Sequence, residues 1–209
     1  MVLAFAAALM ISASPPGLAP LQRHDGATQM QPMDEQSFWT IIDRTAIYEA
    51  DPARQIDALR AELEHLSADE VVAFRNLFEV QLKRAYTWDL WAVTYVVHGG
   101  ASDDGFEYFR RWMVSKGHAV FEHLLVHPDD LADMVVADVD GVLEFEGILY
   151  VTNDVWSEKT GQDAAEMPMN LDLMTMGLEP LGEPFVDDPA HLERRLPKTW
   201  ARFGNDPLY

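Results

Sequence analysis

The chain has 209 residues, of which 48% are hydrophobic and 24% charged, a composition typical of one globular domain with a substantial core. It contains no cysteine, which excludes disulfides, thiol catalysis and cysteine-ligated zinc or iron-sulfur sites. Its formal net charge is -20, and because nucleic acids and anionic membranes attract clusters of Lys and Arg, we expect neither as a partner.

The first 32 residues contain an apolar run from Val2 to Ile11 and then Pro, Gly, Gln and Thr without apolar periodicity. The run has the length of a signal-peptide core, but no Lys or Arg precedes it, and it is too short to span a bilayer. We therefore expect residues 1–32 to be an unstructured extension of a cytoplasmic protein. The alternative is export, with residues 1–19 acting as a signal peptide.

Apolar residues at three- and four-residue spacing predict three successive helices, around residues 38–46, 56–66 and 71–82. The third has the clearest start. Ser67 and Glu70 have the spacing of a capping box, in which each side chain bonds the other residue's backbone amide.

The most apolar predicted helix runs from Tyr86 to His98, and we expect it to lie in the middle of the bundle. Gly99 and Gly100 end it, because glycine adopts left-handed backbone conformations without a side-chain penalty. Ser102 is expected to cap the next helix, which Gly117 closes.

The remaining elements are less regular. A short helix is predicted around residues 120–125, and Pro128 suits the first turn of another. The stretch VLEFEGILYV, residues 142–151, fits either a small strand pair or the start of a helix that ends near Gly161, and we favour the helix.

Residues 163–186 are rich in Met, Pro and Gly and are expected to form an irregular arm on the surface. The pair Asp188-Pro189 starts a last helix, which Pro197 interrupts. Together these elements predict an all-α fold, an irregular multi-helix bundle of one domain over residues 33–209.

Four segments of the sequence resemble the DUF4240 family of bacterial proteins. They are FWTIID at 38–43, DLWAVTYVVHGGASDDGFEYFRRWMVSKG at 89–117, HPDDLA at 127–132 and PKTWARFG at 197–204. The resemblance covers roughly residues 33–204 and implies a compact, mostly helical bacterial protein. The family is uncharacterised, so the resemblance implies no catalytic residue and no cofactor.

The turn HGGASDDGF contains the first candidate site. It lacks the lysine and the order of a phosphate-binding loop, and it follows a helix, so it does not predict phosphate binding. Asp103, Asp104 and Glu107 could form an acidic cluster beside His98, able to hold a hard cation or to act as an acid-base pair, with Arg110 in the same cleft.

The structural interpretation of the same turn is that it only joins two helices, and we favour it. Ser102 would then cap the second helix, and Asp103 and Asp104 would be stabilised by the exposed amides of its first turn. Arg110 and Arg111 could fold back and pair with Glu107 or Asp104.

Two histidines form the second candidate site. His123 and His127 lie four residues apart on one predicted helix face, but the HExxH order of zinc proteases is absent, so we expect no metal there. An aromatic set that includes Trp88 and Trp91 could line a pocket between helices, although such spacing is more often found in a core.

Two functions fit this sequence. Between Lys116 and Lys159 the chain has neither Lys nor Arg, which favours an accessory or interaction protein whose acidic helical surface binds a basic protein. The alternative is an enzyme or small-molecule binder, with or without a metal, whose cleft contains His98, Asp103, Asp104 and Arg110. The sequence does not identify a cofactor.

Overall fold

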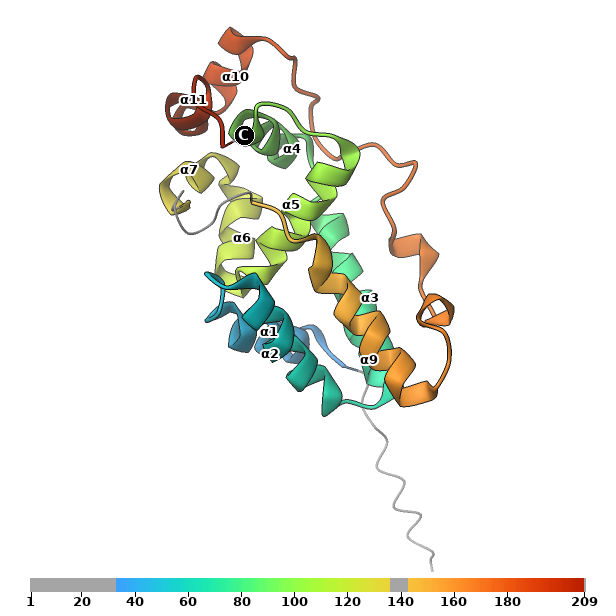
Figure 1. Cartoon of the computed structure of the whole chain (residues 1–209). Helices are drawn as coiled ribbons and strands as arrows, with labels where there is room; N and C mark the ends of the chain where they lie inside the picture. Colours follow the sequence, from blue (N-terminus) through green and yellow to red (C-terminus); the bar gives the residue numbers. More distant parts are fainter. Residues whose placement is uncertain (1–32, 136–142, 209) are drawn as a thin grey trace, which may run out of the picture. The chain divides into compact units, whose positions relative to one another are not determined.

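The computed structural model describes residues 33–135 and 143–208. These residues form helices and 3-10 turns without a β-strand, which confirms the all-α prediction (Figure 1). No helix within the two described ranges is long and apolar enough to cross a membrane. The predicted extension 1–32, and the signal-peptide alternative with it, lies outside the described residues. In chain order the elements are α1 (Glu35–Ala46), α2 (Pro52–Glu64), α3 (Ala68–Arg84), α4 (Trp88–His98), α5 (Asp103–Ser115), α6 (His118–Val126), η1 (Pro128–Asp130), α7 (Leu131–Met134), η2 (Glu146–Leu149), α9 (Tyr150–Thr160), η3 (Ala164–Glu166), η4 (Leu171–Leu173), α10 (Pro189–Arg195) and α11 (Pro197–Phe203).

The helix ends follow the local sequence. The Ser67 amide donates to the Glu70 carboxylate at 2.7 Å and the Glu70 amide donates to the Ser67 hydroxyl at 3.3 Å, which confirms the capping box of α3. Ser102 caps α5 by accepting a hydrogen bond of 3.1 Å from the Gly105 amide. Gly99 ends α4 in the left-handed region, with φ of 66°.

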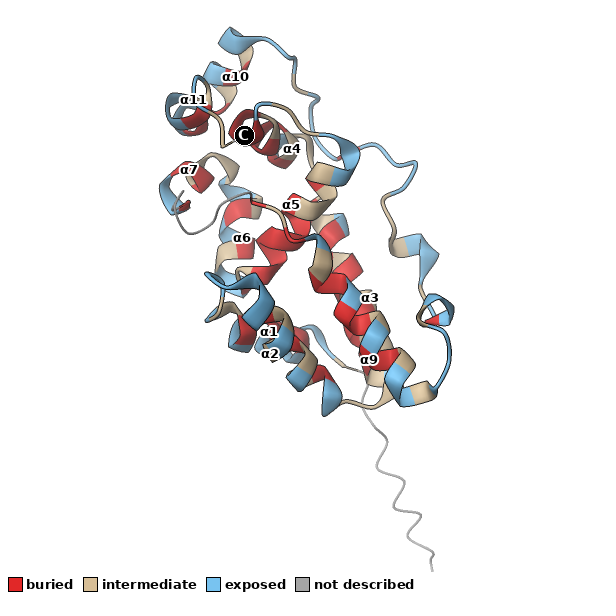
Figure 2. Ribbon diagram, in the orientation of Figure 1, coloured by how far each residue is buried: buried red, intermediate tan, exposed pale blue. Residues whose placement is uncertain are grey.

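Helix α5 lies at the centre of the described bundle. It contacts α1, α3, α4, α6 and η2, and Phe106, Phe109 and Met113 on it are fully buried (Figure 2). Helix α4 is as apolar as predicted, but it packs mainly against α11, η1 and α5. The prediction that α4 is the central helix is therefore wrong. An apolar sequence indicates that a helix is buried, but it does not indicate how many other helices surround it.

The ambiguous stretch 142–151 continues into a helix. Of its described part, 143–151, Ile148 and Leu149 are buried in the 3-10 turn η2, which leads directly into α9. Helix α9 ends at Gly161, whose φ is 72°, as predicted. The described residues of this stretch form no strand pair, because their apolar side chains pack at helical spacing against α3 and α5.

The C-terminal helix α11 is capped by a residue that precedes it by about seventy positions. The two carboxylate oxygens of Asp129 accept hydrogen bonds from the backbone amides of Lys198, at 3.0 Å, and Thr199, at 2.9 Å. The ammonium group of Lys198 also pairs with Asp130 at 2.7 Å and with Asp133 at 2.6 Å. The segments HPDDLA and PKTWARFG therefore bind each other.

The predicted arm, residues 163–186, follows α9 with the turns η3 and η4 and then runs past α3 toward α10 (Figure 1). Hydrogen bonds attach it at several places, of which two lie on either side of its middle part. The ammonium group of Lys83 donates to the Asp172 carbonyl at 2.8 Å. Leu181 bonds the backbone of Tyr86 and Trp88, with both distances 2.9 Å, in an isolated parallel bridge.

The cap from Asp129 gives a stability prediction. Replacing Asp129→Ala leaves two amides of α11 without their acceptor, so the free energy of unfolding should fall by about 1 to 2 kcal/mol. Urea unfolding followed by circular dichroism measures it. Asp57→Ala, a change at an exposed residue of α2, serves as control and should stay within about 0.5 kcal/mol. Equal effects of the two changes would contradict the proposed cap.

Candidate functional site

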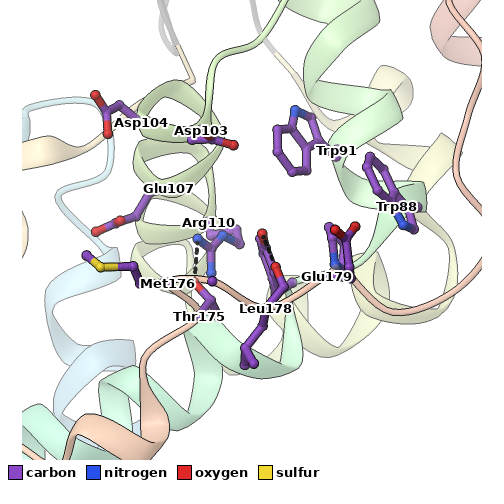
Figure 3. Close-up of a pocket in the computed structure, with 13 residues that line it drawn as sticks. Trp88, Trp91, Asp103, Asp104, Glu107, Arg110, Thr175, Met176, Leu178 and Glu179 are labelled. Atoms are coloured by element: carbon purple, nitrogen blue, oxygen red, sulfur yellow. Dashed lines mark hydrogen bonds between the residues drawn. The ribbon is translucent and has the colours of Figure 1, made fainter.

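A pocket of about 460 Å³ opens beside the HGGASDDGF turn, between the start of α4, the first turns of α5 and the arm (Figure 3). A volume of this size suits a small molecule or one amino-acid side chain with its neighbours. Its lining comes from three parts of the chain. Helix α5 and the segment at the start of α4 provide Asp103, Asp104, Glu107, Arg110, Tyr86, Trp88 and Trp91, of which Tyr86 lies two residues before α4. The arm provides Thr175, Met176, Leu178 and Glu179.

Aromatic rings form one wall of the pocket. The indole of Trp88 stacks on that of Trp91, with ring centroids 5.3 Å apart. Trp91 in turn stacks on the buried ring of Phe106 at 4.8 Å. Trp88 and Trp91 are only partly buried and both line the pocket, so they are not the core residues that their helical spacing usually indicates.

Carboxylates also line the pocket. Asp103, Asp104 and Glu179 are exposed, and within the described ranges none of the three has an ion pair. Glu107 differs, because Arg111 pairs with it four residues along α5. In Figure 3, Asp103 lies on the side of α5 toward Trp91.

Arg110 is the buried charged residue of the pocket, with 3% of its surface exposed. One terminal nitrogen donates to the Leu82 carbonyl at 2.8 Å, and the other donates to the Thr175 hydroxyl at 3.4 Å. Burial lowers the pKa of Arg110 to about 10, so the side chain stays charged at neutral pH. The predicted pairing with Glu107 or Asp104 is thus formed by Arg111 and not by Arg110.

The turn has features that each of the two interpretations names. Ser102 does cap α5, and Asp103 and Asp104 do stand in its first turn, as the structural interpretation predicts. The two aspartates nevertheless line a pocket together with Arg110, as the site interpretation predicts. The cap is thus made by Ser102, and the two aspartates that follow it line the pocket.

His98 does not join this group. Its side chain is buried at the end of α4, with 7% exposed, and it is not among the residues that line the pocket. Burial lowers the pKa of His98 to about 4, so the imidazole is neutral at pH 7. The predicted cluster of His98 with Asp103 and Asp104 is therefore not assembled, because the side chain of His98 packs into the bundle.

The second candidate site is a surface contact. The rings of His123 and His127 lie 5.1 Å apart, and His123 Nε2 is 2.9 Å from the Asp130 carboxylate. Hydrogen bonds from Lys198 and His123 hold the pKa of Asp130 below its ordinary value. In the part of the chain that the structure describes, no three His, Asp or Glu side chains are placed to hold a metal ion, whether here or around Asp103, Asp104 and Glu107.

Several acids of the segment between Lys116 and Lys159 form ion pairs within the described residues. Arg84 pairs with Glu122 at 2.6 Å. Arg60 on α2 pairs with both Asp154 and Glu158, at 3.3 and 3.0 Å. Bases from distant parts of the sequence thus bind several of these acids, and further carboxylates without an ion pair line the pocket.

The family model described as "Protein of unknown function (DUF4240)" matches residues 33–158, more than half of the chain. The chain belongs to the DUF4240 family. The DUF4240 match contains α4 and α5, and it ends before PKTWARFG, so the resemblance of that segment stays a prediction. No curated protein and no solved structure matches the chain.

The sequence patterns did not predict that residues of the arm line the pocket. Thr175 and Glu179 meet Arg110 and Trp88 only because Leu181 bonds the backbone at the start of α4. An isolated bridge between residues almost a hundred positions apart has no local sequence signature. The arm lies outside the DUF4240 match as well, so the family offers no indication either.

The neutral state of His98 gives a pH prediction. Its pKa is lowered in the folded chain and ordinary in the unfolded chain, so the unfolded chain binds more protons and stability falls as the pH drops from about 6.5 toward 4. Between pH 7 and pH 5 this one group should remove about 2 kcal/mol of unfolding free energy. The variant His98→Gln should lack that part of the loss, as measured by urea unfolding at both pH values. An identical loss in the variant would show that His98 does not titrate in this way.

Proposed function

We propose that this DUF4240 protein is a non-enzymatic binding protein whose pocket holds a Lys or Arg side chain of a basic protein partner. The observation that carries the proposal is that unpaired carboxylates and the indoles of Trp88 and Trp91 line one pocket, with Asp103 on the side of α5 toward Trp91 (Figure 3). A cation placed over an indole is attracted by the π face, and the carboxylates add charge-assisted hydrogen bonds.

The charge of the pocket supports a cationic ligand over an anionic one. Four carboxylates line it, from Asp103, Asp104, Glu107 and Glu179, against one guanidinium from Arg110. A phosphate or nucleotide would meet repulsion from most of the lining. A basic side chain gains from both the carboxylates and the net charge of the whole chain, which also accelerates encounter.

An enzyme or small-molecule binder in the same cleft is the alternative that the sequence leaves open. The burial of His98 away from the pocket favours the binding function, because histidine is the usual residue for proton transfer near pH 7. A bacterial setting completes the proposal, supported by the resemblance of the sequence to a bacterial family, and a cytoplasmic setting stays a prediction.

The binding proposal is tested with a fluorescent peptide of alternating lysine and glycine, acetylated and amidated at its ends. Anisotropy should report binding that weakens as NaCl rises from about 0.05 to 0.3 M, because salt screens exposed charges. The double change Asp103→Asn and Asp104→Asn should weaken binding by about tenfold, which corresponds to about 1.4 kcal/mol.

The matched control is the double change Asp57→Asn and Asp69→Asn. It removes the same net charge from exposed positions outside the pocket, and Asp69 stands in the first turn of α3 as Asp103 does in α5. It should leave affinity almost unchanged. If it weakens binding as much as the pocket variant, attraction is general to the acidic chain and the pocket is not the site. Absence of any binding would also refute the proposal.

A further inference from the structure

A pocket for cations does not by itself explain a buried arginine among its lining residues. The guanidinium carbon of Arg110 lies 4.8 Å from the ring centre of Tyr86 and 5.0 Å from that of Phe106. Within the described ranges no Asp or Glu is at ion-pair distance from it. By contrast, the buried Arg75 pairs with Glu79 at 2.5 Å.

The hydrogen bonds of Arg110 are also incomplete. A guanidinium has five N–H donors in a planar fork. The bond to the Leu82 carbonyl is short, the bond to the Thr175 hydroxyl is long at 3.4 Å, and the Nε group is enclosed without an acceptor. A buried charge without an opposite charge is unfavourable, so an anionic group at this position would be strongly stabilised.

The segment that covers Arg110 binds the guanidinium itself only weakly. Thr175 contributes only the long bond, and the next residue, Met176, is 90% exposed. Gly177 has a φ of 75°, a conformation that glycine adopts readily. Bonds at Asp172 and Leu181 lie on either side of this segment, and within it the Tyr86 hydroxyl donates to the Leu178 carbonyl at 3.1 Å. An incoming acceptor therefore has one weak hydrogen bond to replace.

We infer that Arg110 binds the terminal carboxylate of the ligand, so that the pocket takes the C-terminal Lys or Arg of a basic partner. The carboxylate replaces the Thr175 hydroxyl on the guanidinium, and the basic side chain lies among Asp103, Asp104, Glu179 and the two indoles. This inference rests on the proposed function and specifies which part of the partner is bound.

The choice of a carboxylate follows from the surrounding charges. A phosphate carries up to two charges, which the four carboxylates of the lining would repel. A terminal carboxylate carries one charge and brings its own cationic side chain. It also matches the planar fork of a guanidinium, which binds carboxylates through two parallel hydrogen bonds.

The test uses two acetylated hexapeptides of one sequence that ends in arginine, one with a free terminal carboxylate and one with a terminal amide. General attraction to this acidic chain favours the amide, which is more positive by one charge. The inference predicts the opposite order, with the free acid bound about tenfold more tightly by calorimetry. Equal affinities, or tighter binding of the amide, overturn the inference and leave the proposed function standing. If neither peptide binds, the proposed function fails as well.

Two variants locate the effect. Arg110→Met should abolish the preference for the free acid while the salt dependence remains, since the carboxylates of the pocket are kept. Arg54→Met, at an exposed residue of α2, makes the same change of charge outside the pocket and should keep the preference. If Arg110→Met does not fold, Thr175→Ala is measured instead, and it should retain or increase the preference because it removes the competing hydroxyl. Loss of the preference in Thr175→Ala, or its persistence in Arg110→Met, would overturn the inference.

Discussion

The left-handed turn at Gly99 and Gly100 is the constraint on which the pocket depends. Both residues have positive φ, 66° and 145°, so the chain can leave α4 and enter α5 within a few residues. A side chain at Gly99 would also come within 3.1 Å of Pro207. Ser102 then satisfies the free amide of Gly105, and the first turn of α5 comes to lie beside the indole of Trp91. One local backbone feature thus places carboxylates next to exposed aromatic faces.

The acidic residues of the chain fall into two physical classes. Many are used within the fold, as Asp129 is in capping α11 and as Asp154 is in pairing with Arg60. Others, including Asp103 and Glu179, have no ion pair within the described residues and face the pocket. Net charge alone does not distinguish the two classes. Acids with partners inside the fold, such as Asp129 and Asp154, contribute to stability. Acids of the pocket without an ion pair, such as Asp103 and Glu179, are available for binding.

Local features of this fold could be predicted from the sequence, and distant contacts could not. The caps at Ser67 and Ser102 involve residues three apart, so the spacing alone predicts them. The cap from Asp129, the wall formed by Glu179 and the carbonyl partner of Arg110 involve residues far apart in the chain, and many other pairings would suit the same sequence. The structure places Asp103, Asp104 and Arg110 in the lining of one pocket and His98 outside it, and their role as a site stays a prediction.

The indole N–H signals of Trp88 and Trp91 in a nitrogen-15 NMR spectrum test the central claim most directly. The chain has six tryptophans, and two of them line the pocket. When the arginine-terminated peptide is titrated in, the account predicts that these two indole signals shift with saturation, while the signal of Trp156, buried on α9, stays in place. Saturating shifts at Trp156 with Trp88 and Trp91 unmoved would show that the ligand binds elsewhere and would contradict the account.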